Sequence, residues 1–165
     1  MKSVKLIQIF LLICLGIVQG NLLFAQEVEY SHPLHQISFE ASPSWVQVLH
    51  NYNGKVFEVT SPNHNMKILL SFVPDCRNVK RHMKHLSGKK GLICQDKPYD
   101  TILNKRKAVM MQGTCLQGKE PFKRVVIGIP ADEGLYLMEI SCPVECYLTH
   151  RSRLNSILGS LRVEV

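Results

Sequence analysis

The stretch Met66-Lys67-Ile68-Leu69-Leu70-Ser71-Phe72-Val73 decides the fold of this chain. Its even-numbered residues are apolar and share one face of the strand that the pattern predicts. Leu69 and Val73 make the opposite face apolar as well. Strands that are apolar on both faces are typical of the interior of a covered sheet. We therefore expect a central strand here, with other elements packed on both of its faces.

A helix is expected directly after this strand. Asp75 is a good N-cap residue, and Gly88 is a typical helix end. Val79, Met83 and Leu86 recur at helical spacing and predict a narrow apolar stripe that faces the core.

The remaining elements complete an α+β pattern. Strands are expected over Ile37–Ala41 and Lys55–Thr60, and two hairpins follow the first helix. The predicted hairpins pair Leu92–Leu103 with Lys107–Leu116, and Phe122–Ile129 with Leu135–Ser141. A second helix begins near Cys142, with Pro143 as its first helical residue, and a short strand ends the chain over Arg162–Val165. We expect a mostly antiparallel sheet flanked by two amphipathic helices.

The first residues have the pattern of a secretory leader. Lys2 and Lys5 supply positive charge, Leu6–Val18 is an apolar stretch, and Ala25 is a small residue suited to cleavage. The apolar stretch is shorter than the roughly 20 residues that span a bilayer, which argues against a membrane anchor. We expect a signal peptide over residues 1–25, cleaved near Ala25. A single domain over residues 26–165 would then be periplasmic or secreted and not membrane-spanning.

Five of the six cysteines follow this leader, namely Cys76, Cys94, Cys115, Cys142 and Cys146. In an oxidising compartment cysteines usually pair, and an odd number leaves at least one unpaired. The sequence leaves open which cysteine is unpaired and how Cys76, Cys142 and Cys146 are connected.

One cysteine pair has a geometric argument. Cys94 and Cys115 lie at nearly equal distances from the turn that we predict around Asn104-Lys105-Arg106, so they would oppose one another across the hairpin. That position is within reach of a disulfide, although a bulge at Pro98 would shift the register by one residue. Cys94 and Cys115 are therefore our disulfide candidates.

The charge of the chain points to anionic partners. The formal net charge of +7 falls to +5 when Lys2 and Lys5 leave with the leader. Basic side chains gather on the side of the first helix opposite its apolar stripe, at Arg77, Lys80, Arg81 and Lys84. This basic face is a candidate anion-binding surface for phospholipid headgroups, a polyanionic glycan or an acidic protein. The alternative is a solvated face without a ligand. Nucleic acid is not expected, since an exported protein rarely meets it.

Metal and catalytic sites are not expected. His32 and His35, or Cys76 with His82 and His85, have spacings that could bring two ligands together, but a complete site needs more ligands than these spacings supply. We interpret these histidines as surface residues and expect no cofactor.

Three short stretches carry a resemblance to a known family. They are Ile37-Ser38-Phe39-x-x-x-Pro43-x-Trp45, Thr60-Ser61-Pro62 and Ile157-Leu158-Gly159-Ser160-Leu161. With the order of elements, they resemble the PsbP/Mog1-like family of α/β/α sandwiches over about residues 35–165. That family includes photosystem-associated extrinsic proteins and many small exported bacterial proteins. The resemblance implies the fold and a role as a non-catalytic binding or accessory module, and it transfers no functional residue.

The leading functional hypothesis is an exported, non-catalytic binding or accessory domain of the cell envelope. Its partner would be an anionic envelope component or an acidic protein. The competing hypothesis is a thiol-dependent enzyme or redox protein that uses Cys142 and Cys146, where a helix N-terminus would lower the pKa of a thiol. A structural envelope protein is a third hypothesis, which no residue pattern separates from the first.

Overall fold

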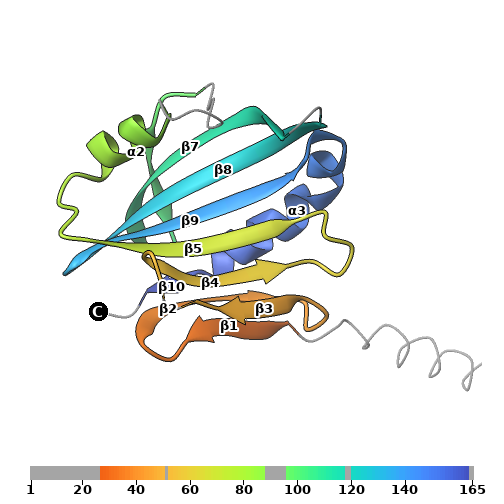
Figure 1. Ribbon diagram of the computed structural model, residues 1–165, viewed down its shortest axis with the longest axis horizontal. Coiled ribbons are helices and arrows are strands. Elements are labelled where there is room, and N and C mark those ends of the chain that lie inside the picture. The colour runs from red at the N-terminus through yellow and green to blue at the C-terminus, as the bar shows by residue number, and fades with distance from the viewer. Residues whose placement is uncertain (1–26, 51, 88–95, 118–119, 164–165) are drawn as a thin grey trace, which may run out of the picture.

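The computed structural model describes residues 27–50, 52–87, 96–117 and 120–163 of the 165-residue chain. The described residues form ten strands and two helices (Figure 1). In chain order these are β1 (Val28–His32), β2 (His35–Ala41), β3 (Val46–Leu49), β4 (Lys55–Thr60), β5 (Lys67–Pro74), α2 (Val79–Ser87), β6 (Tyr99–Leu103), β7 (Arg106–Gln117), β8 (Glu120–Ala131), β9 (Gly134–Pro143), α3 (Val144–Ser160) and β10 (Arg162–Val163). None of the helices in these ranges is long and apolar enough to cross a membrane.

The strands form two sheets. A seven-stranded sheet has the order β3-β4-β5-β9-β8-β7-β6, and a three-stranded sheet has the order β1-β2-β10. Every pairing between the described strands is antiparallel. The α+β fold with a mostly antiparallel sheet and two helices is therefore confirmed.

The β5 strand lies inside the large sheet, between β4 and β9, as its apolar pattern predicts. Ile68 and Leu70 are fully buried on the face that looks toward the three-stranded sheet. Leu69 on the opposite face is half-buried. The prediction of an interior strand is thus confirmed, although helix α2 packs on residues of β7, β8 and β9 and Leu69 lines a surface hollow.

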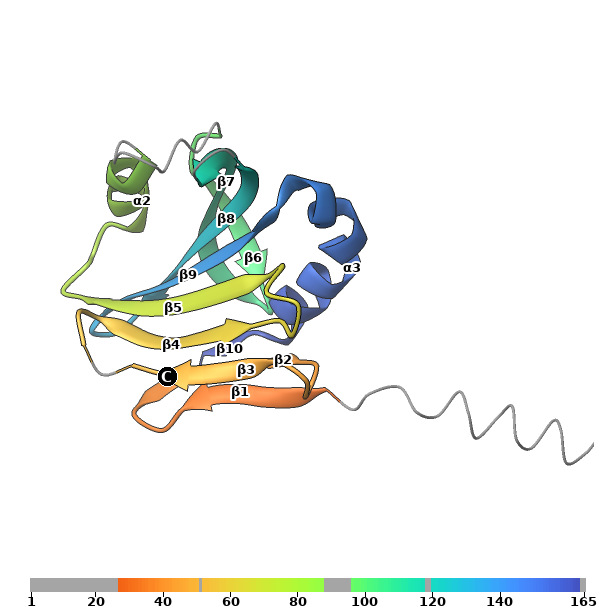
Figure 2. The ribbon, with the colours of Figure 1, turned by 45° about the vertical axis from the view of Figure 1, so that its right-hand side comes forward.

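The two helices lie on opposite sides of strands β7, β8 and β9 (Figure 2). Helix α3 packs on the main core, which fills the space between the two sheets and includes its buried residues Leu154 and Ile157. Helix α2 covers a smaller core, in which Met83 is fully buried against strands of the large sheet. Val79 and Leu86 pack beside Met83, so the predicted apolar stripe of the first helix is confirmed.

Two strands of the structure were not expected from the sequence. The strands β1 and β3 precede and follow β2, and they make the chain begin with five strands rather than three. Each of them contains few consecutive apolar residues, so neither has the pattern of a buried strand. The protein therefore has a separate three-stranded sheet where the sequence predicted one continuous sheet.

The starts of both helices also differ from the prediction. Asp75 has a positive φ of 57° and lies in the turn before α2, whereas the Asn78 side chain caps the helix by accepting the Arg81 N–H at 2.9 Å. Strand β9 continues to Pro143, so Cys142 is a strand residue and α3 begins at Val144. Cys142 therefore precedes its helix, and its pKa is raised by burial rather than lowered by a helix N-terminus as predicted.

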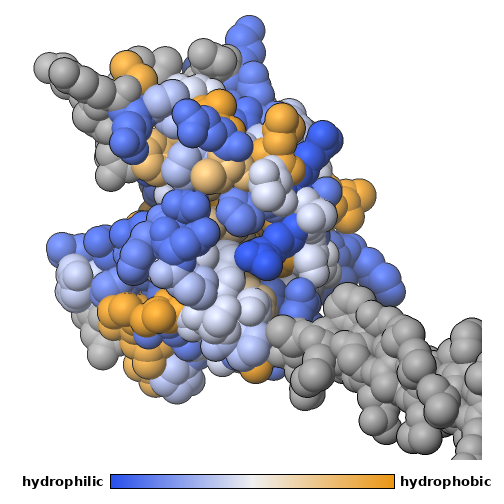
Figure 3. All heavy atoms as spheres, turned by 90° about the vertical axis from the view of Figure 1, so that its right-hand side faces the viewer, coloured by the Kyte–Doolittle hydropathy of each residue, from blue (hydrophilic) through white to orange (hydrophobic). Residues whose placement is uncertain are grey.

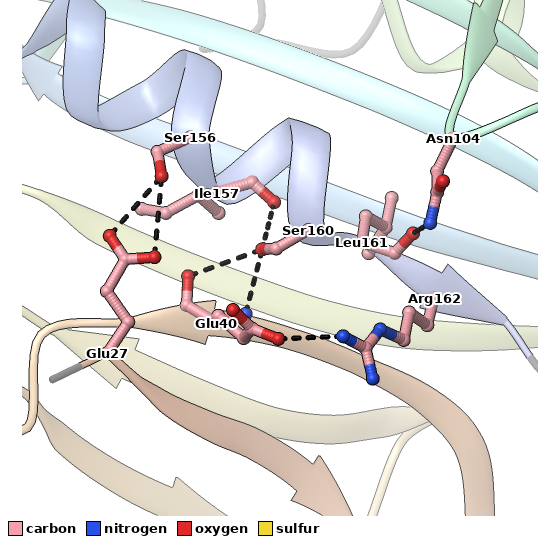
Figure 4. Close-up of polar contacts among 8 residues, drawn as sticks. All are labelled: Glu27, Glu40, Asn104, Ser156, Ile157, Ser160, Leu161 and Arg162. Atoms are coloured by element: carbon pink, nitrogen blue, oxygen red, sulfur yellow. Dashed lines mark hydrogen bonds and ion pairs between the residues drawn. The ribbon is translucent and has the colours of Figure 1, made fainter.

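Hydrogen bonds and one ion pair fix the end of α3 to β2 (Figure 4). The Ser160 Oγ accepts the Glu40 N–H at 2.9 Å and donates to the Ile157 carbonyl at 2.9 Å. The Arg162 guanidinium lies 2.8 Å from the Glu40 carboxylate. These contacts hold the C-terminal strand β10 against β2, although the two strands are far apart in the sequence.

Candidate functional site

A cleft of ≈ 390 Å³ lies between the tips of the β1–β2 and β8–β9 hairpins, beside the start of β7 and strand β10. We call it the hairpin cleft. Residues of both sheets line it: Leu34, His35, Gln36, Phe72, Arg106, Ala131, Asp132, Glu133, Tyr136 and Val163. Ligand sites are commonly concave and combine apolar side chains with polar groups that orient the ligand, and this cleft is lined by both kinds in similar number.

Three aromatic rings contact one another within the cleft. Phe72 and Tyr136 are direct partners across β5 and β9, and their ring centroids are 5.0 Å apart. The His35 ring lies 5.7 Å from Phe72 and 6.0 Å from Tyr136, in tilted and edge-on arrangements. Such geometries are favourable for aromatic pairs. The first residue of β2 is thereby joined to the large sheet.

Two glycines allow the backbone to close around Phe72. Gly54 has a positive φ of 70°, and its carbonyl accepts the Phe72 N–H at 2.6 Å. A Cβ atom at Gly134 would lie 2.3 Å from the Val73 carbonyl oxygen and 3.0 Å from the Phe72 ring. The Asp75 N–H also donates to the Glu133 carbonyl at 3.0 Å. These contacts bring the acidic β8–β9 turn beside the aromatic rings.

The two histidines of the β1–β2 hairpin pack against each other, with ring centroids 5.0 Å apart. His32 is buried, and its Nδ1 accepts the Leu34 N–H at 3.1 Å, which requires that nitrogen to be unprotonated. Burial lowers the pKa of His35, and His32 lowers it further. Burial also raises the pKa of Tyr136, while a backbone hydrogen bond with Gln36 acts in the opposite direction. Neutral rings therefore line this part of the cleft at neutral pH.

The rim of the cleft carries charges of both signs. Arg106 is half-buried, and no ion pair joins it to another residue in the described ranges. Asp132 and Glu133 are exposed in the β8–β9 turn. Leu34, at the tip of the β1–β2 hairpin, is 80% exposed. A ligand could therefore contact apolar, aromatic, cationic and anionic groups within one small volume.

A second hollow, of ≈ 320 Å³, lies on the part of the large sheet that α2 leaves uncovered. It is lined by Lys67, Leu69, Cys115, Leu116, Phe122, Arg124, Glu139 and Ser141. The half-buried Arg124 and Glu139 form an ion pair in it, and Lys67 pairs with Glu58 at 2.7 Å. Its charged groups thus have partners within the protein, unlike Arg106 of the hairpin cleft.

The basic face of the first helix is exposed, as predicted, but it is not uniformly available. Arg77, Arg81 and Lys84 are exposed, and Arg77 lies before the helix rather than in it. Lys80 forms an ion pair with Asp100 of β6 at 2.5 Å. Arg81 and Lys84 line a broad hollow of ≈ 800 Å³ beside α2, together with Cys76, Asn78, His82 and His85.

The turn between β6 and β7 has the register on which the Cys94–Cys115 prediction rests. Leu103 pairs with Arg106 and Tyr99 with Met110. Cys94 lies outside the described residues, and Cys115 is a free thiol in this structure. The disulfide therefore stays a prediction.

The environment of Cys142 argues against a reactive thiol. Its side chain is buried at the end of β9, opposite Lys123 in the strand register. Burial, and secondarily the nearby Cys146, raise the pKa of Cys142 to about 11, against a smaller opposing effect of Lys123. A nucleophilic cysteine needs its pKa lowered so that the thiolate is populated. The surroundings of Cys142 raise its pKa instead.

The histidines that we considered as metal ligands are His32, His35, His82 and His85. No group of three or more His, Cys, Asp and Glu side chains converges in the part of the chain that the structure describes. His32 and His35 contact each other, but His32 is buried rather than a surface residue, so that part of the interpretation was wrong.

The hairpin cleft itself was not predicted. Its residues come from β2, β5, β7, β8, β9, β10 and two turns, most of which are distant from one another in the sequence. The aromatic residues at its base have the same alternating pattern as core residues. The pairing of β5 with β9, which places Phe72 beside Tyr136, is a long-range contact that hydrophobic periodicity does not specify.

Comparison with known proteins places the fold but not the function. No family model and no curated protein matches the chain. Among solved structures, the cyanobacterial PsbP protein (CyanoP) of Synechocystis sp. PCC 6803 is similar, with a TM-score of 0.66 and 11% sequence identity. The match covers 86% of this chain and 94% of that one.

Two further structures have the same architecture. LpqN, which is involved in cell envelope biogenesis of Mycobacterium tuberculosis, matches with a TM-score of 0.58 and 13% identity over 85% of this chain and 91% of its own. The Ran-binding protein Mog1p of Saccharomyces cerevisiae matches with a TM-score of 0.54 and 9% identity over 84% and 96%. The PsbP/Mog1-like fold is thus confirmed, and at these identities the likeness concerns the fold alone.

Proposed function

We propose that this chain is an exported, non-catalytic binding module of the cell envelope, and that the hairpin cleft binds its partner. The observation that carries the proposal is the half-buried Arg106, which forms no ion pair with another described residue and lies beside an aromatic base and two exposed carboxylates. A half-buried guanidinium favours a carboxylate or another planar anion. A partner segment with an acidic and an apolar side chain would match this arrangement.

Export is supported by the leader pattern of residues 1–25 and by the cysteine content that follows it. LpqN, which has the same fold, is involved in cell envelope biogenesis, and Mog1p is a Ran-binding protein. These functions belong to those proteins, and they support a binding role here by analogy of fold. The raised pKa of the buried Cys142 thiol speaks against the competing thiol chemistry.

The basic face of Arg77, Lys80, Arg81 and Lys84 is a second candidate surface. The observation that favours it is the hollow beside α2, which Arg81 and Lys84 line. Its partner would be an anionic envelope component or an acidic protein. The ion pair between Lys80 and Asp100 reduces its positive charge, so we rank this surface below the hairpin cleft.

Capture from the native envelope tests both surfaces. The full chain, carrying a C-terminal tag, is expressed in its own organism, cross-linked briefly, and recovered from the envelope and cytosolic fractions. A cleft variant (L34D with R106Q) is compared with a helix variant (R77Q, K80Q, R81Q and K84Q). R153Q, at an exposed position on α3, is the control for loss of a positive charge.

We expect the cleft variant to lose a cross-linked partner that the wild type, the helix variant and the control retain. Loss of the cross-linked partner in the helix variant alone would indicate that the basic face, rather than the hairpin cleft, binds the partner. Equal capture by all four proteins would contradict both surfaces. Recovery of the chain in the cytosol with residues 1–25 intact would contradict export.

A further inference from the structure

We propose that the β3 edge of the seven-stranded sheet is a self-association surface that pairs with β3 of a second copy of this chain. Among the described strands, β3 pairs with β4 alone and is therefore a terminal strand of the sheet. A terminal strand presents unpaired backbone N–H and C=O groups, which another strand can bind.

The outward backbone groups of β3 can be assigned. The His50 N–H donates to the Val56 carbonyl, and this position continues the β3–β4 register in which Val48 opposes Glu58. Backbone groups alternate in direction along an antiparallel strand. The backbone groups of Gln47 and Leu49 therefore point away from β4. The next outward carbonyl, that of Trp45, already accepts the Tyr30 hydroxyl at 3.1 Å, which ends the free edge on that side.

The side chains along this edge are apolar and exposed. Val46, Val48 and Leu49 are 58%, 48% and 50% exposed, and Tyr52 beyond them is 56% exposed. Figure 3 shows apolar residues gathered low on one side of the molecule, with other apolar groups spread over its upper half. Exposed apolar side chains on a pairing-competent edge indicate an interaction surface.

The edge lacks the charges that usually prevent strands from associating. The stretch from Ala41 to Gly54 contains no Asp, Glu, Lys or Arg. On the neighbouring strands, Glu58 and Lys67 neutralise each other in an ion pair at 2.7 Å. At the opposite end of the same sheet, β6 carries Asp100 on its edge. Charged residues protect sheet edges against pairing, and β6 carries Asp100, which pairs with Lys80 of α2, whereas β3 carries no charged residue.

The pattern favours a second copy because it is self-complementary. In a two-fold antiparallel arrangement centred on Val48, Gln47 of each copy opposes Leu49 of the other. This register pairs all four outward backbone groups of each strand and brings the two Val48 side chains together on one face. It also places no like charges opposite each other, although each chain carries a net charge of +7. A four-residue edge buries little area, so we expect a weak, concentration-dependent dimer.

Sedimentation of the protein purified after expression of the full chain tests the inference. We expect the wild type to shift from monomer to dimer as its concentration rises. V48K would place two like charges at the two-fold axis and raise the dimer dissociation constant about tenfold or more. The matched control is I102K on the β6 edge, where Ile102 is 70% exposed, and it should associate like the wild type. Circular dichroism establishes that both variants are folded.

The register has its own test. Opposed residues in a non-hydrogen-bonded pair lie close enough for a disulfide, so V48C should form a cross-linked dimer on mild oxidation. V46C, which opposes His50 of the second copy, should cross-link no more than the wild type, whose own cysteines give the background. A wild type that stays monomeric at every soluble concentration would overturn the proposal. Equal dimerisation of V48K and the wild type, or equal cross-linking of V46C and V48C, would also overturn it.

Discussion

Phe72 and Tyr136 oppose one another across β5 and β9, with ring centroids 5.0 Å apart, and His35 of the smaller sheet contacts both rings. This contact is where the two sheets meet at the hairpin cleft. The stability of this contact therefore depends on the charge of His35.

Acid should destabilise the protein through His35. Burial lowers the pKa of this histidine, so the unfolded chain binds a proton more readily than the folded one. The contribution of neutral His35 to the free energy of unfolding is complete above about pH 6.5, the ordinary pKa of histidine. It decreases as the pH falls toward the lowered pKa of the folded state. The melting temperature should fall less between pH 7.5 and 5 in H35F than in the wild type. Besides His32 and Tyr136, the charged groups Arg106, Asp132 and Glu133 line this cleft.

The control for that measurement is H64N. His64 is exposed in a turn with a positive φ of 55°, which asparagine tolerates. H64N should keep the pH dependence of the wild type. The same dependence in H35F would show that other groups are responsible.

Gly134 and Gly159 should respond oppositely to alanine. A Cβ atom at Gly134 meets the Val73 carbonyl oxygen at 2.3 Å, so we expect G134A to lower the free energy of unfolding by about 2 kcal/mol or more. Gly159 lies in α3, where a Cβ atom would meet nothing within 4 Å beyond its own helix turn, and G159A should stabilise by up to about 1 kcal/mol. Urea unfolding monitored by circular dichroism measures both values. Equal effects of G134A and G159A on the free energy of unfolding would contradict the close approach of β5 to the β8–β9 turn.

Ser160 should matter more than Ser156, although both hydroxyls lie on α3. Ser160 accepts the Glu40 N–H at 2.9 Å in a partly buried position, whereas Ser156 reaches an exposed Glu27 carboxylate at 3.3 Å. We expect S160A to cost about 1–2 kcal/mol of unfolding free energy, because it leaves a backbone donor unpaired. S156A should cost less than about 0.5 kcal/mol. Denaturant titration of the two variants in parallel decides whether the Ser160 hydrogen bonds shown in Figure 4 stabilise the fold.

Cys142 should alkylate slowly in the folded protein. With a pKa of about 11 and a buried side chain, it has little thiolate at neutral pH. Under reducing conditions, iodoacetamide at pH 7.5 should label the half-buried Cys146 well before Cys142, as peptide mass spectrometry can show. Labelling of both at equal rates in unfolded protein is the control. Fast labelling of native Cys142 near pH 6 would restore the thiol-enzyme hypothesis.

The sequence predicted the elements that have strong local patterns. The interior strand around Ile68 and Leu70, the stripe of Val79 and Met83, and the hairpin of β8 with β9 all follow from periodicity and turn residues. The strands β1 and β3 were missed because, at five and four residues, they are too short to show a clear periodic pattern. Their places depend on long-range contacts such as the Tyr30 hydroxyl with the Trp45 carbonyl.

The positions of Lys80, Arg81 and Lys84 on the first helix follow from spacing within that helix, although Arg77 lies before it. The hairpin cleft could not be predicted, since it needs the position of Arg106 relative to Tyr136 across several strands. Likewise, the start of the first helix was displaced because the positive φ of Asp75 belongs to a turn held by Glu133, which is remote in the sequence.

The small sheet joins residues from the two extremes of the described chain, since Ile37 of β2 pairs with Val163 of β10. A polypeptide that emerges amino-terminus first, from a ribosome or from a translocation channel, cannot complete this sheet until its last strand is free. Until then β2 has one unpaired edge, and Val163 of β10 does not yet pack on the main core. The pairings of β2 with β10 and of β5 with β9 join strands that are not consecutive, and non-local pairings slow folding, so we expect folding to finish only after synthesis. Nascent chains arrested before Arg162 should remain sensitive to protease.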